Sequence, residues 1–395
     1  MQSTFHIAID GNEANVAERV GSNAYAFEIL KHLEKILHER WESSPEENKK
    51  DLPEVKVSVL LSAPPQTDLP PERSGWKYEV FGPTAFWTQY ALPWYLFKHR
   101  KEIDVFYTPG HYAPRLSSVP YVSSVMDLAF LQFPEQFKEK DYLQLKEWTR
   151  YSVKHAQKVI AISEYTKADV VKNYRIDPEK VVVAYPSVVQ TGDVSYKEKA
   201  KIAVFKKWQI KQPYLLYVGT LQPRKNLVRL IEAFEKLHAD KDLLKAQELR
   251  LVIAGKTGWL ANDILQKIEK SPFKAKIILT GYIMETEKII LYKGSLCTVL
   301  VGLYEGFGMP ALEAMRYGSI PVVSATTSLP EVVGNAGILV DPEQVSDIKR
   351  GLAMVISLPA KERGKLLRNG RQQLKKFDWT KSAQVVLETL ISCHK

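Results

Sequence analysis

Two glutamates, two glycines and a proline lie close together in the segment from Glu305 to Glu313, which reads EGFGMPALE. An apolar run at residues 298–301 precedes it and an amphipathic run follows it, so the segment is expected to join a strand to a helix. The glycines let main-chain N–H groups approach a ligand, and the first turn of a helix attracts anions. Because we expect Glu313 in that turn, both carboxylates should lie on the rim of one anion-binding pocket. The alternative is that Glu313 only complements the helix dipole and Glu305 is an ordinary loop charge.

A second group of charges, Arg224 and Lys225, lies in the segment GTLQPRKN, which starts at Gly219 directly after an apolar run. Two cations at the start of a helix oppose its dipole, at a cost of about 0.3–1 kcal/mol each. A bound diphosphate would compensate them, and arginine can hold phosphate through two parallel hydrogen bonds. We therefore expect a phosphate-binding site here, in preference to a solvated pair of charges.

A third segment, Gly255-Lys256-Thr257, resembles the end of an ATP-binding P-loop. That motif requires a glycine where Arg250 stands, so ATP is not expected to bind here. Cysteine, histidine and acidic residues are not grouped at metal-ligand spacing, so neither a metal nor another cofactor is expected.

Strands that alternate with helices are predicted in both halves of the chain. The predicted strands of the first half are 5–9, 55–61, 105–107, 121–125, 158–162 and 181–184. Those of the second half are 214–218, 249–254, 276–280, 298–301, 320–323 and 338–340. This α/β pattern predicts two doubly wound parallel sheets, whose ligands bind at the carboxyl ends of the strands.

The domain boundary is expected in a polar stretch near the middle of the chain. The first domain should span residues 1–190, a hinge residues 191–212, and the second domain residues 213–377. A terminal helix from about Trp379 to Ile391 comes after the doubly wound pattern is complete. Residues 378–395 are therefore candidates to pack back on the first domain.

The formal net charge of +10 is unevenly distributed, with about −2 in residues 1–200 and about +12 in the rest. Much of the excess lies on predicted helix faces and no nucleic-acid motif accompanies it, so nucleic acid is not an expected partner. Only Cys297 and Cys393 occur, which is too few for a disulfide framework. No apolar run reaches the roughly 18 residues of a membrane span, and the N-terminus lacks a signal pattern, so a cytoplasmic protein is expected.

The segment from Glu305 to Glu313 resembles the E-x7-E signature of the family-4 retaining glycosyltransferases, whose GT-B fold has two facing Rossmann-like domains with an interdomain cleft. The segments LPEV at 329–332 and GILVDP at 337–342 follow at the spacing of that group, and the resemblance spans essentially the whole second half. It implies that Glu305 contacts hydroxyls of the transferred sugar and that Glu313 holds the ribose. The other residues implied in donor binding are Gly219, Arg224, Lys225, Tyr282, Ile283, Gly306, Phe307, Gly308 and Met309.

The first half departs from the same family at two places. A Gly-x-Gly-Arg-Tyr run is common in the family before the first helix; here Gly21 and Tyr25 match it, whereas Asn23 and Ala24 do not. Gly21 remains the expected contact to the donor diphosphate. Met126 stands where many relatives have a histidine near the reaction centre, and methionine cannot act as an acid, a base or a charged donor.

Three explanations of Met126 stay open. The histidine is dispensable in this branch, another residue such as His111 serves nearby, or the activity is altered. Asp127, next to Met126, is the candidate acceptor-side carboxylate, and a structural aspartate at a strand end is the equal alternative.

The resemblance, which is closest to bacterial mannosyltransferases of polysaccharide assembly, implies a retaining hexosyltransferase. It should move a sugar, mannose as the first choice, from a GDP- or UDP-sugar to a glycan or lipid-linked acceptor. The donor phosphate takes the proton of the acceptor hydroxyl, so the scheme needs no metal and no paired acid and base. The alternatives are an epimerase or hydrolase of nucleotide sugars on the same fold, a binding protein with altered catalysis, and a nucleic-acid binder.

The stretch from Phe86 to Arg100 combines aromatic and basic residues. It is a candidate for peripheral contact with the inner face of a membrane that carries a lipid-linked acceptor. A partly buried helix of a globular domain is the favoured alternative.

Overall fold

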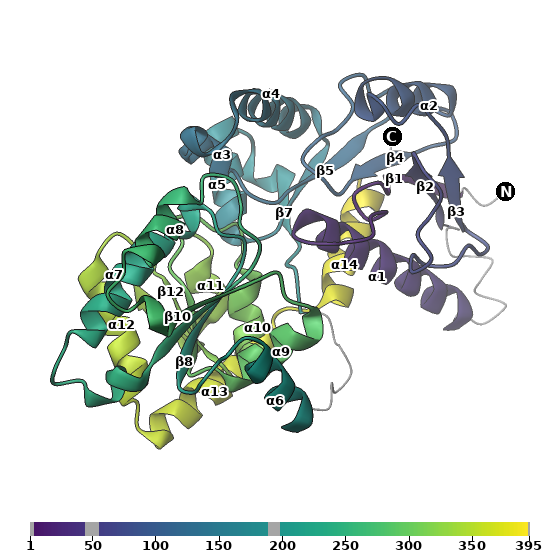
Figure 1. The fold of residues 1–395 in the computed structure, drawn as a ribbon. Coiled ribbons are helices and arrows are strands. Elements are labelled where there is room, and N and C mark those ends of the chain that lie inside the picture. The colour runs from purple at the N-terminus through teal and green to yellow at the C-terminus, as the bar shows by residue number, and fades with distance from the viewer. Residues whose placement is uncertain (1–3, 44–54, 189–197, 394–395) are drawn as a thin grey trace. The chain divides into compact units, whose positions relative to one another are not determined.

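The chain folds into two compact units in a computed structural model, which describes residues 4–43, 55–188 and 198–393. Unit 1 comprises residues 1–186 and 378–395, and unit 2 comprises residues 187–377 (Figure 1). The chain therefore builds most of unit 1, completes unit 2, and returns to unit 1 with its last helix.

Seven parallel strands form the sheet of unit 1, in the order β3-β2-β1-β4-β5-β6-β7. They are β1 (Phe5–Asp10), β2 (Val55–Leu61), β3 (Trp76–Val80), β4 (Val105–Thr108), β5 (Tyr121–Val125), β6 (Lys158–Ala161) and β7 (Val181–Val183). Every residue of β1, β4 and β5 is buried, as parallel strands covered on both faces require. The strand order reverses between β1 and β4, which is where a sheet of this kind binds its ligands.

Helices of unit 1 cover both faces of this sheet. They are α1 (Ser22–Ser43), the π-helical turn η2 (Trp87–Ala91), α2 (Leu92–Lys98), α3 (Ala129–Gln132), α4 (Glu139–His155), α5 (Glu164–Tyr174) and α14 (Trp379–Ile391), with the 3-10 turns η3 (Pro134–Gln136) and η4 (Pro178–Lys180). The terminal helix α14 packs beside α1 (Figure 1), where the ring of Trp379 lies 5.6 Å from that of Tyr25 and 6.4 Å from that of His32. The last helix thus belongs to the core of unit 1.

Six parallel strands form the sheet of unit 2, in the order β10-β9-β8-β11-β12-β13. They are β8 (Tyr214–Val218), β9 (Arg250–Ala254), β10 (Ile277–Gly281), β11 (Cys297–Leu300), β12 (Ile320–Ser324) and β13 (Ile338–Val340). The order reverses between β8 and β11, so the loops after these two strands lie at the switch point. Those loops contain the two charged segments singled out from the sequence.

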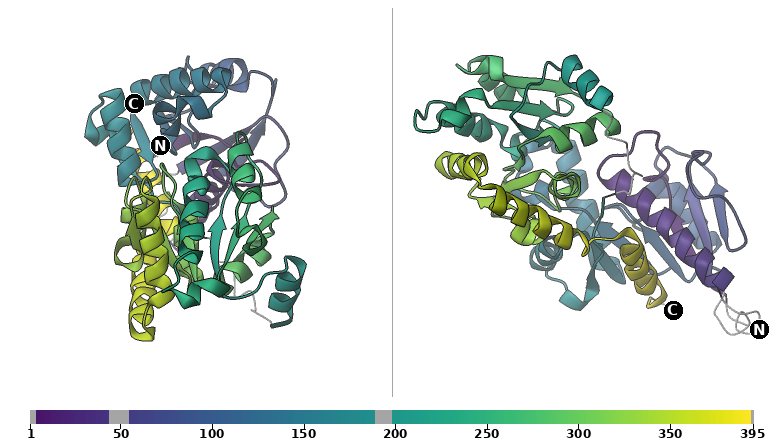
Figure 2. Two further views of the ribbon diagram at one scale, coloured as in Figure 1. Left: turned by 60° about the vertical axis from the view of Figure 1, so that its left-hand side comes forward. Right: turned by 90° about the horizontal axis from the view of Figure 1, so that it is seen from below.

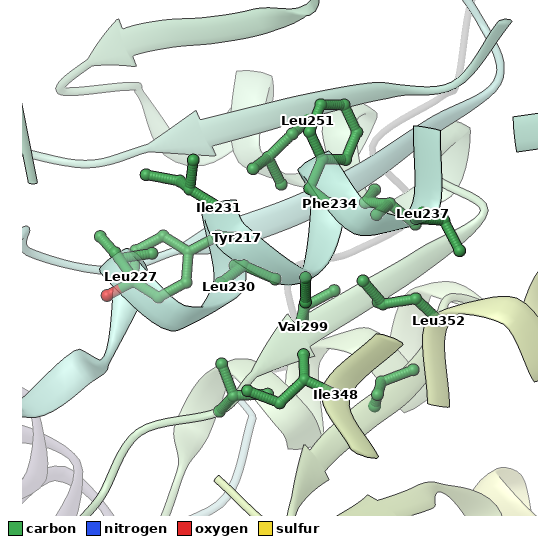
Figure 3. Close-up of a cluster of buried hydrophobic side chains, with 14 of the residues drawn as sticks. Tyr217, Leu227, Leu230, Ile231, Phe234, Leu237, Leu251, Val299, Ile348 and Leu352 are labelled. Atoms are coloured by element: carbon green, nitrogen blue, oxygen red, sulfur yellow. The ribbon is translucent and has the colours of Figure 1, made fainter. Parts of the chain in front are cut away.

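The helices of unit 2 also cover both faces of their sheet (Figure 2). They are α6 (Glu198–Lys207), α7 (Leu227–His238), α8 (Asn262–Glu269), α9 (Glu285–Gly294), α10 (Met309–Tyr317), α11 (Leu329–Val333), α12 (Val345–Ser357) and α13 (Ala360–Leu374), with the 3-10 turns η5 (Pro223–Lys225), η6 (Leu244–Glu248), η7 (Lys274–Lys276) and η8 (Gly334–Ala336). The apolar face of α7 packs with α12 and the strands, as Figure 3 shows for Leu230, Phe234, Val299 and Leu352. This core fixes the start of α7, and with it η5.

The predicted fold class, two Rossmann-like parallel-sheet domains, is confirmed, and the structure differs from the sequence-based prediction in two details. The edge strand β3 was not predicted, because only Trp76 of its five residues is fully buried. Within the expected hinge, residues 191–197 lie outside the described residues, and residues 198–207 form α6, which packs against α9 in unit 2. No helix in the described ranges is both long and apolar enough to cross a membrane.

Candidate functional site

The loop between β11 and α10 is held in a single conformation by glycine and serine. Gly308 has φ +99°, which strains other residues, and a Cβ atom built on it would lie 2.4 Å from Cδ2 of Leu329, so this side chain would have to move. The hydroxyl of Ser328 donates hydrogen bonds to the carbonyls of Glu305 and Phe307, both at 2.9 Å. These contacts hold the loop at the amino end of α10, where anions are favoured.

Glu305, at the start of this loop, is only 8% exposed. Its Oε1 lies 2.6 Å from Nζ of Lys225, and its Oε2 lies 3.9 Å from Nη1 of Arg224. Arg224 also donates a 3.2 Å bond to the carbonyl of Tyr304, and the N–H of Leu303 donates a 2.8 Å bond to the carbonyl of Arg224. The structure therefore brings the two charged segments together in one charge cluster: Arg224, Lys225 and Glu305.

Both cations of the charge cluster lie in η5, which Asn226 closes in a left-handed conformation with φ 60°. The buried side-chain amide of Asn226 donates to the carbonyls of Val301 and Pro342, at 2.9 and 2.7 Å. It thereby ties η5 to the segment that follows β11. The cluster has two cations and one carboxylate, and a phosphate group can form charge-assisted hydrogen bonds with both cations.

The carboxyl ends of β8 and β9 approach each other closely. Gly255, after β9, has φ +151°, and a Cβ atom there would lie 2.0 Å from the carbonyl oxygen of Gly219. After the next strand, β10, Tyr282 is 55% exposed and its ring centre lies 4.6 Å from Nζ of Lys256. The side chain of Ile283 is buried in the core, so a ligand at this edge would meet its main chain.

Glu313 lies in the second turn of α10, because the helix begins at Met309, so its expected place in the first turn is wrong. Its carboxylate contacts α9: Oε1 lies 2.6 Å from Nζ of Lys288, and Oε2 accepts a 2.6 Å bond from the hydroxyl of Tyr292. Burial lowers the pKa of Lys288, but the carboxylates of Glu313 and Glu285 more than offset this and raise it to about 12. The two glutamates of the signature thus have separate cationic partners.

In unit 1, Gly21 precedes α1 with φ +56°. Asn23, in the first turn of α1, donates through its side-chain amide to the carbonyl of Glu13 at 2.9 Å and to the Oε2 atom of Glu13 at 2.8 Å. The hydroxyl of Ser22 lies 3.3 Å from the same Oε2 atom. The start of α1 is therefore tied to the loop that follows β1.

His111 follows β4, and Asp127 follows the neighbouring strand β5. Nδ1 of His111 is buried and has no hydrogen-bond partner among the described residues. Burial lowers the pKa of His111, and the charge of Asp127 opposes that shift. Oδ1 of Asp127 accepts a 3.0 Å bond from the N–H of Ala129 at the start of α3, which gives Asp127 a structural contact as well. Met126, between β5 and this aspartate, is half-buried.

Asp10, the last residue of β1, is a buried carboxyl and was not among the predicted site residues. Its Oδ2 accepts a 3.2 Å bond from Nε1 of Trp87, and its Oδ1 accepts a 3.1 Å bond from the N–H of Asn12. Burial raises the pKa of Asp10 to about 6, although these hydrogen bonds oppose the shift.

The strand-end rule could have pointed to Asp10 and Glu13, because both come at the end of the first predicted strand or just after it. No sequence signal indicates Lys288 and Tyr292, since their contact with Glu313 depends on how α9 packs against α10. In residues 4–43, 55–188 and 198–393, no group of three or more His, Cys, Asp or Glu side chains is placed to hold a metal ion. The chemistry these residues can support is anion binding in unit 2 and hydroxyl recognition in unit 1.

Two family profiles match the chain in succession. Residues 21–189 match the profile described as Glycosyltransferase Family 4, and residues 199–373 match the one described as Glycosyl transferases group 1. Together the matches cover most of unit 1, without β1 and α14, and nearly all of unit 2.

Curated relatives include bacterial mannosyltransferases. The chain is 28% identical to the O-antigen chain mannosyltransferase B of Escherichia coli, over 70% of this chain and 71% of that protein. It is 27% identical to the O-antigen chain mannosyltransferase RfbU of Salmonella typhimurium, over 60% of this chain and 61% of that protein.

Solved structures share the fold across the whole chain. A glycosyltransferase from Rickettsia africae superposes with a TM-score of 0.70 at 16% identity, covering 99% of this chain and 98% of that one. The profiles, the relatives and this fold agree with the site geometry: the chain belongs to the family-4 retaining glycosyltransferases with the GT-B fold.

Proposed function

We propose that this family-4 glycosyltransferase transfers mannose from GDP-mannose to a glycan or lipid-linked acceptor in polysaccharide assembly. The observation that carries the proposal is the charge cluster, with Lys225 2.6 Å from Glu305 beside the amino end of α10. The relatives named as O-antigen mannosyltransferases support mannose as the transferred sugar. A UDP-hexose is the second choice of donor.

In the proposed reaction the bond between the anomeric carbon and the diphosphate breaks first, and positive charge builds on the sugar. The acceptor hydroxyl attacks from the same face and gives its proton to a phosphate oxygen of the leaving group. Arg224, Lys225 and the amino end of α10 stabilise the departing diphosphate. Glu305 contributes by fixing Lys225 and by offering its carboxylate to sugar hydroxyls.

The remaining proposed donor contacts lie along the same edge of the sheet in unit 2. Glu313 is assigned to the ribose hydroxyls, while the main chain at Tyr282 and Ile283 meets the base. The main chain at Gly219 and across the segment from Gly306 to Met309 approaches the diphosphate and the sugar. In unit 1, Gly21 is assigned to the diphosphate, whereas His111 and Asp127 are candidates on the acceptor side.

Nucleotide-sugar binding tests the proposal directly, because a ligand that binds the native state raises the melting temperature by mass action. GDP-mannose is expected to raise it most in a panel of GDP-, UDP- and ADP-sugars. Arg224→Ala should weaken that binding about ten- to a hundredfold, since it removes a charge-assisted contact worth about 1.5–3 kcal/mol. If no nucleotide sugar shifts the wild-type melting temperature, the proposal is rejected.

Arg350→Ala is the matched control for this test. Arg350 lies on α12 of the same unit, is half-exposed and pairs with Asp347. Its removal takes away one arginine and one ion pair without touching the charge cluster, so nucleotide affinity should stay unchanged. Equal loss of nucleotide affinity in both variants would mean that the affinity depends on the net positive charge of unit 2 and not on a contact of Arg224.

We also propose that unit 1 contacts an anionic membrane through the exposed face of η2 and α2. Four large aromatic side chains lie on this face and are more than half exposed: Phe86 (66%), Tyr90 (68%), Trp94 (62%) and Phe97 (57%). On the opposite face, Trp87, Leu92 and Leu96 are buried in the core. The stretch is therefore a partly buried helix that also has an aromatic outer face.

Charge on this aromatic face favours an anionic lipid surface at the cytoplasmic side of a membrane. Nζ of Lys98 lies 5.3 Å from the ring centre of Trp94, and the guanidinium of Arg100 lies 4.1 Å from that of Phe97. Residues 80–101 contain no Asp or Glu. Aromatic rings beside basic groups are typical of segments that lie in the lipid interface.

Vesicle sedimentation tests the membrane contact. The wild type should bind vesicles rich in anionic lipid and not neutral ones, and Trp94→Glu should abolish that binding without lowering the melting temperature. Leu244→Glu, at a side chain of unit 2 that is 78% exposed, should bind like the wild type. Unchanged binding of Trp94→Glu would contradict the proposed face.

A further inference from the structure

Glu13 lies in the loop that follows β1, at the edge of the unit 1 sheet where the strands end. Hydrogen bonds fix its side chain in place. Both hydrogen bonds that fix the carboxylate reach the same atom, Oε2: one from the amide of Asn23 at 2.8 Å and one from the hydroxyl of Ser22 at 3.3 Å. A third bond, from Asn23 to the main-chain carbonyl of Glu13 at 2.9 Å, fixes the backbone. The other carboxylate oxygen, Oε1, accepts no hydrogen bond from the described residues.

The loop after β4 packs directly across this carboxylate. A Cβ atom on Gly110 would lie 3.4 Å from Cγ and 3.6 Å from Oε1 of Glu13, which is van der Waals contact. Since β1 and β4 are neighbours at the switch point, the loops after them meet where ligands of such sheets bind. His111, the next residue after Gly110, has a buried Nδ1 atom without a partner in the described part of the chain. Oε1 of Glu13 and Nδ1 of His111 are thus two polar atoms on adjacent loops that have no hydrogen-bond partner among the described residues.

The partners of Glu13 are electrically neutral. Asn23 and Ser22 are uncharged, and no lysine or arginine in the described ranges forms an ion pair with Glu13. The charge of Glu13 contributes to the raised pKa of Asp10, which is also acidic. A carboxylate in this setting suits the hydroxyl groups of a neutral sugar and disfavours an anionic one.

We propose that Glu13 recognises the acceptor: its Oε1 accepts a hydrogen bond from a hydroxyl of a neutral acceptor sugar, and Asn23 positions it. This assignment rests on the proposed transferase function. Asn23 stands where the family pattern has its second glycine, so this chain places a positioning side chain there. Glu13 binds and orients the hydroxyl, while the acceptor proton still passes to the donor phosphate.

Steady-state kinetics with GDP-mannose as donor and fluorescently tagged mannobiose as acceptor test the proposal. In Glu13→Gln, the amide oxygen is expected to face Asn23, which leaves an NH2 group in place of Oε1. The acceptor KM should rise at least tenfold, whereas the donor KM and the melting-temperature shift with GDP-mannose stay unchanged. Asn23→Ala should raise the acceptor KM in the same direction by a smaller factor.

Glu18→Gln is the matched control, because Glu18 is an exposed acid five residues further along the same loop. Its acceptor KM should equal that of the wild type. An unchanged acceptor KM in Glu13→Gln overturns the proposal, as does a parallel loss of donor binding and thermal stability, which would indicate a structural loop contact. The proposal is also overturned if the wild type binds nucleotide sugar but uses only anionic acceptors. Absence of nucleotide-sugar binding in the wild type would instead reject the proposed transferase function.

Discussion

Glu313 is held by two residues of α9, and that arrangement makes Tyr292 testable at the level of one atom. Tyr292 is fully buried, and its hydroxyl donates a 2.6 Å bond to Oε2 of Glu313. Tyr292→Phe removes only this bond and leaves the ion pair to Lys288. If Glu313 binds the donor, we expect the donor KM to rise about three- to tenfold, for a lost bond of about 1 kcal/mol, with kcat nearly unchanged.

Tyr317→Phe serves as the control for Tyr292→Phe, because the ring of Tyr317 packs 5.9 Å from that of Tyr292. It alters the same aromatic pair without removing the bond to Glu313. A change in kcat alone, or equal effects in both variants, would contradict a role of Tyr292 in holding Glu313 for the donor.

Asp10 makes a pH-dependent contribution to the stability of unit 1. Burial raises its pKa from 3.8 to about 6, so the folded state favours the protonated form. The contribution of Asp10 to stability is therefore largest at low pH and falls as the pH rises from about 4 to about 6. The side chain in Asp10→Asn cannot ionise. The difference in free energy of unfolding between the wild type and this variant should therefore change by on the order of 2–3 kcal/mol over that pH window, and acidic pH should favour the wild type.

Thermal unfolding followed by tryptophan fluorescence checks the Asp10 prediction, since six of the eight tryptophans lie in unit 1. The melting temperatures of wild type and Asp10→Asn should be compared at several pH values between 4 and 8. A difference that stays constant over this range would show that Asp10 does not titrate with a raised pKa.

At the level of elements, the conformation of the loop before α10 depends on one glycine. Gly308→Ala would place a methyl group 2.4 Å from Leu329 and would hold alanine at φ +99°. We expect a loss of stability of about 1–3 kcal/mol and a clear loss of nucleotide affinity, because the backbone strain and the displaced Leu329 side chain both disfavour the present loop conformation. Differential scanning calorimetry and nucleotide titration measure the two effects.

Gly318→Ala separates loop geometry from backbone strain. Gly318 ends the same helix with φ +80°, and no atom lies within 4 Å of the position where its Cβ would be. This variant should lose stability through backbone strain but keep the nucleotide affinity of the wild type. Loss of affinity in Gly318→Ala would show that strain anywhere in α10 disturbs the site.

Most elements could be predicted from the sequence because their signals are local. The apolar stripe of α14 and the buried strands of both units show in the spacing of side chains, whereas β3 has only Trp76 fully buried and no apolar run. The same distinction applies to the candidate site. Arg224, Lys225 and Glu305 stand next to predicted strand ends, but the bond from Asn23 to Glu13 and the contact of Lys288 with Glu313 depend on packing between elements.

For the molecule as a whole, unit 2 meets the conditions for independent folding. It has its own six-stranded sheet and hydrophobic core. Its two ends lie side by side, because the hydroxyl of Ser187 donates a 3.0 Å bond to the carbonyl of Phe377. Except for Gly21, all the proposed donor-binding residues belong to this unit.

A polypeptide of residues 187–377 should therefore fold alone and bind the donor nucleotide. We expect its Kd for GDP-mannose to lie within about fivefold of that of the whole protein, less than about 1 kcal/mol apart, while transfer to an acceptor is lost. Circular dichroism and calorimetric titration check folding and binding.

A shorter polypeptide of residues 187–372 is the control, because it lacks Phe377. The ring of Phe377 packs edge-on 5.5 Å from that of Phe307 in the loop before α10, so the shorter chain should bind the donor more weakly. If residues 187–377 fold but do not bind, then unit 1 contributes more to the donor site than Gly21, and the assignment of the donor to unit 2 is wrong.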